Sequence, residues 1–197
     1  MRQRVITRQR MINIPNAITL ARILLVPLFL SLLAEGSNKM ALCVFVAAGL
    51  SDGIDGTIAR LTDTRTTLGA HLDPLADKLL LVSAYIALAI LGMIPQQLMI
   101  FVLVRDAVIL GGFLLSAAVV GRSIPMNPSI WGKMTTFLQI SAVTLVLLDR
   151  STWLLVPARY LDVVFVATSA ACVVSGAGYV IDGIRWYQSI EPGAGVG

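Results

Sequence analysis

Six long apolar runs, separated by short polar or proline-containing segments, dominate the sequence. Each has about the 20 residues that an α-helix needs to cross the ~30 Å hydrocarbon core of a bilayer. Charged residues make up 13% of the 197-residue chain, well below the ~25% typical of a soluble domain. We therefore expect an all-α integral membrane protein with six transmembrane helices. The expected spans are residues 17–34, 40–60, 68–91, 97–120, 131–148 and 160–181.

The segments outside these runs suggest three parts. Residues 1–16 interleave four arginines with apolar side chains, a pattern typical of an amphipathic interfacial helix on anionic lipid headgroups. We prefer this interpretation to a nucleic-acid-binding arm and expect membrane lipids, not nucleic acid, as partners. Residues 17–186 are expected to form one six-helix transmembrane domain, and the glycine-rich residues 187–197 a flexible tail.

The distribution of lysine and arginine predicts the orientation in the membrane. Six spans place both termini on the same side, and placing them in the cytoplasm puts most of the basic residues there. Cytoplasmic loops of membrane proteins carry an excess of lysine and arginine. We therefore expect both termini, and the connection between the second and third spans, on the cytoplasmic side of a bacterial inner membrane.

Four aspartates flank that connection. Asp52 and Asp55 stand three residues apart, and Asp73 and Asp77 stand four apart, so on helices each pair projects from one face. A helical hairpin bent in the polar segment between them brings the two faces together. Converging carboxylates repel one another unless cations lie among them, and hard divalent cations such as Mg²⁺ or Mn²⁺ prefer oxygen ligands. The sequence therefore predicts a divalent metal site.

Small residues and one arginine accompany the aspartates. Gly56 and Gly69 lack a side chain where a bulky ligand can approach the backbone. Ala59 lies four residues after Asp55 and keeps the acidic face open, and Arg60 follows it. Two divalent ions beside an arginine suit a substrate that contains a diphosphate.

The combined spacing resembles the signature of the CDP-alcohol phosphatidyltransferases at all eight of its positions. The flanking segments 13–22 and 72–78 resemble the branch that contains the phosphatidylglycerophosphate synthases and the CMP-forming cardiolipin synthases. The matching pattern is Asp52-x2-Asp55-Gly56-x2-Ala59-Arg60-x8-Gly69-x3-Asp73-x3-Asp77.

This resemblance implies a metal-dependent transferase of phospholipid biosynthesis. It would pass a phosphatidyl group from CDP-diacylglycerol to a glycerol-type acceptor and release CMP. Asp52, Asp55 and Asp73 would hold two Mg²⁺ or Mn²⁺ ions. Asp77, counted with these ligands, would also act as the general base on the acceptor hydroxyl.

The resemblance also implies roles for the smaller residues and for the assembly. Gly56, Ala59 and Gly69 would make room for the cytidine nucleotide, and Arg60 would support the site electrostatically. Members of the family are typically homodimers, so a homodimer is expected.

We assign the acceptor site to Arg105 and Lys133. Adjacent helix residues point about 100° apart, so we expect Arg105 to face a cavity rather than to pair with Asp106; an internal pair that only stabilises packing is the alternative. Residues 107–120 contain no basic residue, and the two remaining cations suit a single phosphodiester. Phosphatidylglycerol is thus the preferred acceptor, giving cardiolipin, and glycerol 3-phosphate is the alternative.

Two further alternatives remain at the sequence level. An acidic cavity inside a membrane can be the cation pathway of a transporter, although that function would not require Gly56, Ala59, Arg60 and Gly69 at their spacing. His71, the only histidine, is the next candidate for the general base if Asp77 is not.

Overall fold

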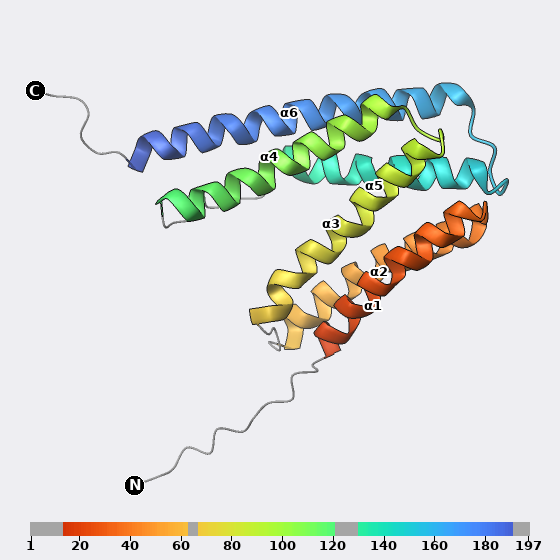
Figure 1. Ribbon diagram of the computed structural model, residues 1–197, viewed down its shortest axis with the longest axis horizontal. Helices are drawn as coiled ribbons and strands as arrows, with labels where there is room; N and C mark the ends of the chain where they lie inside the picture. The colour runs from red at the N-terminus through yellow and green to blue at the C-terminus, as the bar shows by residue number, and fades with distance from the viewer. Residues whose placement is uncertain (1–13, 63–66, 121–129, 191–197) are drawn as a thin grey trace, which may run out of the picture. The chain divides into compact units, whose positions relative to one another are not determined.

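The computed structural model describes the backbone of residues 14–62, 67–120 and 130–190, and the side chains of residues 23–50, 78–112 and 130–188. Every regular element within these residues is an α-helix (Figure 1). The expected N-terminal interfacial helix and most of the expected tail lie outside them. The helices are α1 (Ile14–Ala34), α2 (Asn38–Thr62), α3 (Thr67–Ile90), α4 (Gln96–Val120), α5 (Ile130–Arg150) and α6 (Ala158–Ile190).

The six apolar runs are confirmed as helices, and only α6 differs clearly from its predicted length. It continues to Ile190, whereas we expected the span to end at Ile181. The apolar run ends near Ile181, but residues 182–190 contain no proline that would stop a helix, and the next proline in the sequence is Pro192. At 1.5 Å per residue, a helix of 33 residues is ~50 Å long and exceeds the bilayer core. The end of the apolar run therefore does not mark the end of the helix.

Two of the described helices are long and apolar enough to cross a membrane: α5, and α6 over Ala158–Gln188. Shorter apolar stretches occur in the described parts of three others, at Ile23–Ala34, Asn38–Leu50 and Lys78–Ile90. The structure therefore supports a membrane protein with two candidate spans.

Glycines in the left-handed conformation end α1 and α3. Gly36 has φ +74° and Gly92 has φ +67°. After each of them, the next backbone N–H donates to a carbonyl five residues back, from Ser37 to Leu32 and from Met93 to Leu88, both at 2.8 Å. This is the Schellman arrangement, which satisfies carbonyls that the helix end leaves without partners. It explains why short connections suffice between α1 and α2 and between α3 and α4.

The chain forms two compact units, divided between Ser83 and Ala84. In the first, α1 and α2 pack side by side (Figure 1). The rings of Phe29 and Phe45 stand 5.7 Å apart between centroids and are tilted by 40°. Both side chains are buried, so this aromatic pair forms the centre of the α1–α2 contact.

In the second unit, α6 packs against both α4 and α5. Apolar side chains from all three helices, such as Val102, Val146 and Cys172, are buried there. Polar contacts also cross between the helices. The Thr135 hydroxyl on α5 lies 2.7 Å from the carbonyl oxygen of Trp131 in its own helix and 3.1 Å from that of Ala171 on α6.

Several positions in this unit have the reverse of the polarity expected in a soluble protein, although its interior also contains apolar side chains. Large apolar side chains such as Phe137 and Val166 are about 70% exposed, whereas Thr135, Gln139 and Thr168 are buried. Water would favour the opposite arrangement. A lipid surround favours this one, because apolar side chains face hydrocarbon while polar ones hydrogen-bond between helices.

We expect Gly92→Ala to lower stability by about 1–2 kcal/mol, the cost of a left-handed backbone for a residue with a Cβ atom. A Cβ atom at Gly92 meets nothing within 4 Å, so the loss comes from the backbone conformation alone. The thermal midpoint in detergent measures it. Gly112→Ala, in the interior of α4 where the space is also open, is the control and should leave the midpoint unchanged or raise it. Equal effects of the two substitutions would contradict the explanation.

We expect Thr135→Val to lower stability by about 0.5–1 kcal/mol, because it removes the hydroxyl between α5 and α6 while keeping the side-chain shape. The matched control is Thr144→Val, because the Thr144 hydroxyl bonds only within α5 in the contacts described, to Ile140 at 2.8 Å. Unfolding of both variants in the same detergent tests the difference. A loss at Thr144 as large as that at Thr135 would rule out the interhelical bond as the cause.

Candidate functional site

The residues of the acidic motif fall on two consecutive helices. Asp52, Asp55 and Arg60 lie in the last turns of α2, and Asp73 and Asp77 lie in the first turns of α3. The segment between the helices, residues 63–66, is outside the described residues, as are the side chains of the whole motif. The helical setting that the sequence predicts is therefore confirmed. The metal-binding and catalytic roles of the aspartates stay predictions.

Arg105 and Asp106 form a buried ion pair on α4. The distance from Arg105 Nη1 to Asp106 Oδ1 is 2.7 Å, and each residue is only 7% exposed. The expectation that these neighbours would not pair is wrong. Their Cα–Cβ directions do diverge by about 100°, but the long arginine side chain can fold back along the helix to the carboxylate. Because the pair is withdrawn from solvent, it is screened far less than a surface pair.

The guanidinium of Arg105 also contacts α6. Its Nη2 donates a hydrogen bond of 3.3 Å to the Ser175 hydroxyl. Sequence reasoning did not identify Ser175, because it is 70 positions away in the chain. The available signal was a small polar residue next to a glycine, Gly176, within an apolar span, a combination that often marks close helix contacts in membranes.

Two glycines border the Arg105 side chain. A Cβ atom at Gly132 on α5 would lie 3.6 Å from Arg105 Nη2, and one at Gly176 on α6 would lie 3.9 Å from Arg105 Cγ. These are ordinary van der Waals distances, so a methyl group at either position would lie in contact with the arginine. The arginine therefore lies in a narrow space that small residues on both neighbouring helices keep open.

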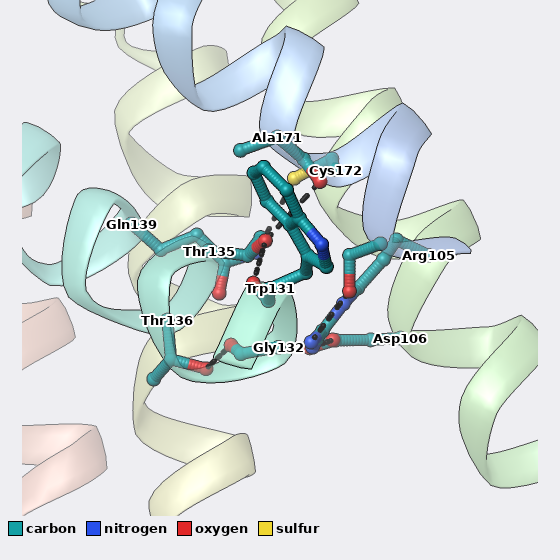
Figure 2. Close-up of polar contacts among 10 residues, drawn as sticks. Arg105, Asp106, Trp131, Gly132, Thr135, Thr136, Gln139, Ala171 and Cys172 are labelled. Atoms are coloured by element: carbon teal, nitrogen blue, oxygen red, sulfur yellow. Dashed lines mark hydrogen bonds and ion pairs between the residues drawn. The ribbon is translucent and has the colours of Figure 1, made fainter. Parts of the chain in front are cut away.

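A buried polar face of α5 continues from Gly132 (Figure 2). Thr135 and Gln139 follow it at intervals of three and four residues, so they share a face. The Gln139 side-chain amide lies 3.5 Å from Cys172 Sγ, and the Tyr85 hydroxyl donates to the Gln139 backbone carbonyl at 3.1 Å. This face joins α5 to α6 and to the end of α3.

Lys133 does not belong to this buried face. It is next to Gly132 in the sequence, but its side chain is exposed on α5. Of the two residues that the sequence assigns to the acceptor, only Arg105 lies inside the cluster of buried polar groups.

The buried atoms in the cluster that have no hydrogen-bond partner among the described residues include Arg105 Nε and Gln139 Oε1. An unpartnered buried polar atom costs about 1–3 kcal/mol, so such atoms are uncommon without a role. One is a donor on a cation and the other an acceptor on a neutral amide. Arg105 Nε can therefore offer its N–H to an anion, and Gln139 Oε1 can accept from a hydroxyl or a water molecule.

Comparison with known proteins gives a family match. The profile of the CDP-alcohol phosphatidyltransferase family matches residues 12–175. This range includes both halves of the acidic motif on α2 and α3, as well as Arg105 and Ser175.

Individual relatives agree with this match. A probable phosphatidylglycerophosphate synthase of Mycobacterium tuberculosis is 36% identical over 185 residues, covering 90% of this chain and 85% of that protein. A CDP-diacylglycerol–glycerol-3-phosphate 3-phosphatidyltransferase of Bacillus subtilis is 32% identical, covering 86% and 94%. The CMP-forming cardiolipin synthase of Homo sapiens is 40% identical over 99 residues, covering 50% and 33%. The chain therefore belongs to the CDP-alcohol phosphatidyltransferases and is a transferase of phospholipid biosynthesis.

Proposed function

We propose that the protein transfers the phosphatidyl group of CDP-diacylglycerol to phosphatidylglycerol, forming cardiolipin and CMP. The observation that carries the reaction is the position of the acidic motif. All eight of its residues lie towards the end of α2 or the start of α3, which are consecutive helices, inside the range that matches the family. The choice of acceptor rests on the separate Arg105–Asp106 pair.

Asp52, Asp55 and Asp73 are the proposed ligands of two Mg²⁺ or Mn²⁺ ions, with Asp77 beside them. The donor set fits such ions, because hard divalent cations take carboxylate oxygens. When bound, they supply charge stabilisation for the diphosphate and the CMP leaving group. Arg60 adds a fixed positive charge next to the carboxylates, which supports binding of the anionic nucleotide.

Asp77 is the proposed general base. It lies one helical turn after Asp73 on α3, so it shares a face with a metal ligand. A carboxylate there can take the proton of the acceptor hydroxyl while the hydroxyl oxygen attacks the phosphorus atom next to diacylglycerol. The bond to the CMP oxygen breaks, CMP leaves with the electron pair, and the phosphodiester product remains. Gly56, Ala59 and Gly69 are proposed to leave room for the nucleotide.

The proposed setting is an inner membrane with six spans, at residues 17–34, 40–60, 68–91, 97–120, 131–148 and 160–181. The excess of basic residues on one side supports cytoplasmic termini and a cytoplasmic active site. The inside-out polarity of α5 and α6 supports contact with lipid. A homodimer is proposed from the family resemblance alone.

The Arg105–Asp106 pair supports phosphatidylglycerol as the acceptor. Glycerol 3-phosphate carries nearly two negative charges near neutral pH, and a small dianion needs several fixed cations. In the described part of α4, residues 96–112, Arg105 is the only basic residue, and Asp106 already neutralises it. A phosphodiester with one negative charge and a lipid-soluble body needs fewer fixed cations in its binding site.

Glycerol 3-phosphate is a second candidate because of how much of the chain each relative covers. The relatives from M. tuberculosis and B. subtilis, which cover 86% or more of this chain, carry the names of enzymes that make phosphatidylglycerophosphate. The human cardiolipin synthase covers half of it. Lys133 and the basic residues outside the described part could supply the additional positive charge.

We expect the purified protein, given CDP-diacylglycerol, Mg²⁺ or Mn²⁺ and both acceptors together, to release CMP and to form cardiolipin as the main product. Mass spectrometry of the lipids identifies the product. Excess chelator should abolish CMP release, because the carboxylates then repel one another without cations.

Phosphatidylglycerophosphate as the main product would overturn the choice of acceptor and leave the family reaction standing. Full turnover in excess chelator would instead contradict the proposed metal requirement. Cation transport without CMP release would favour the transporter alternative.

We expect Asp77→Asn to reduce turnover by about 100-fold or more while CDP-diacylglycerol binding persists, because a general base acts mainly in the chemical step. Asp55→Asn is the matched comparison on α2 and should instead weaken metal-dependent nucleotide binding. Turnover at saturating substrate and CMP binding measured by calorimetry separate the two effects. Near-normal turnover of Asp77→Asn would move the base elsewhere, with His71 as the next candidate.

A further inference from the structure

We infer that Asp106 and Ser175 select the acceptor by acting on Arg105 from two sides, which makes them positioning residues for the acceptor phosphate. This inference rests on the proposed function, because it assigns the acceptor anion to Arg105. Asp106 holds Nη1 from α4 at 2.7 Å, and Ser175 holds Nη2 from α6 at 3.3 Å. We call the three residues the arginine clamp.

Asp106 sets the charge that Arg105 presents. A guanidinium and a carboxylate in contact carry no net charge, and each residue of the pair is only 7% exposed. Charge interactions in such a weakly polar setting are several-fold stronger than in water. An approaching dianion is therefore attracted by Arg105 and repelled by Asp106 at nearly the same range. A monoanion meets half of both the attraction and the repulsion, and it gains most of its affinity elsewhere, from the lipid portion of the molecule.

Ser175 and the two glycines set the position of the guanidinium. Gly132 and Gly176 leave a space that the arginine fills at van der Waals distance, and the Ser175 hydroxyl fixes the Nη2 end of the group. With both terminal nitrogens engaged, the guanidinium is held in one orientation. A phosphate therefore has to reach the N–H groups that this orientation leaves available.

These two contacts leave one guanidinium nitrogen, Arg105 Nε, without a partner in the cluster. It is buried and has no hydrogen-bond acceptor among the described residues. A single N–H suits one oxygen of a phosphodiester, whereas a phosphomonoester has three equivalent oxygens to satisfy. The clamp thus explains why one arginine on α4 can serve a lipid phosphodiester and serve a small dianion poorly.

The test compares Asp106→Asn and Ser175→Ala with wild type and with Ser169→Ala, in bilayer discs without phosphatidylglycerol of their own. Ser169 is a matched control on α6, because its hydroxyl bonds within that helix, to Phe165 at 2.8 Å. Phosphatidylglycerol and glycerol 3-phosphate compete for CDP-diacylglycerol, and mass spectrometry gives the ratio of the two products. Calorimetry gives the affinity for glycerol 3-phosphate without any turnover.

Asp106→Asn should shift the product ratio toward phosphatidylglycerophosphate by about tenfold or more, because it uncovers one positive charge in a weakly polar site. It should also bind glycerol 3-phosphate more tightly by a similar factor. Ser175→Ala should raise the KM for phosphatidylglycerol about fivefold, with the KM for CDP-diacylglycerol and kcat unchanged. Ser169→Ala should behave as wild type in every measurement.

The clamp is overturned if folded Asp106→Asn keeps both the wild-type ratio and the wild-type affinity for glycerol 3-phosphate. Should Asp106→Asn fail to fold, Ser175→Ala decides: a KM for phosphatidylglycerol equal to that of Ser169→Ala overturns the clamp. If wild type makes phosphatidylglycerophosphate, the proposed acceptor is wrong, and the shift caused by Asp106→Asn still tests the clamp. If wild type transfers to neither acceptor, the calorimetric affinity of Asp106→Asn for glycerol 3-phosphate, compared with that of wild type, tests the clamp.

Discussion

A positive charge buried among apolar helices is the constraint on which the second unit of the structure depends. Arg105 is 93% withdrawn from solvent, as its 7% exposure shows, and an isolated cation there would cost several kcal/mol. Three features reduce this cost: the carboxylate of Asp106, the hydroxyl of Ser175 and the space beside two glycines. These features come from α4, α5 and α6, so the same arginine that needs them also fixes how the three helices pack.

The polar face of α5 follows from the same constraint. A hydroxyl or amide that faces lipid has no hydrogen-bond partner, so Thr135 and Gln139 are stable only where other helices supply one. They bond to Ala171 and Cys172 on α6, and Tyr85 bonds to the Gln139 backbone. Exposed valines and leucines surround this interior. The reversed polarity is therefore a single pattern in which polar groups join helices and apolar groups face the surroundings.

The sequence predicts well whatever depends on neighbours in the chain. Apolar runs located six helices, and Gly36 and Gly92 mark turns because each takes a left-handed conformation next to a helix end. Prediction failed where the outcome depends on side-chain reach or on distant segments. The Arg105–Asp106 contact was kept only as the alternative, because the preferred interpretation used Cα–Cβ directions and ignored the length of arginine. Ser175 could not be connected to Arg105 without the packing of α6 on α4. The acidic motif was identified from spacing alone because its eight residues lie within 26 consecutive positions, Asp52 to Asp77.

The two groups of charges in this chain differ in whether they are balanced internally. The motif on α2 and α3 has four aspartates within its eight residues and only Arg60 as a cation, so on the proposed function bound cations balance its excess negative charge. The pair on α4 is neutral as it stands and requires none. A phosphatidyltransferase needs both arrangements. The diphosphate of the donor needs strong positive charge, which metal ions supply. An acceptor selected for its lipid portion is better bound by a site with little net charge, because a strongly positive site would also bind small anionic metabolites from the cytoplasm. On the proposed function, the acidic motif with its bound cations therefore carries out the reaction, and the neutral Arg105–Asp106 pair limits which alcohol takes part in it.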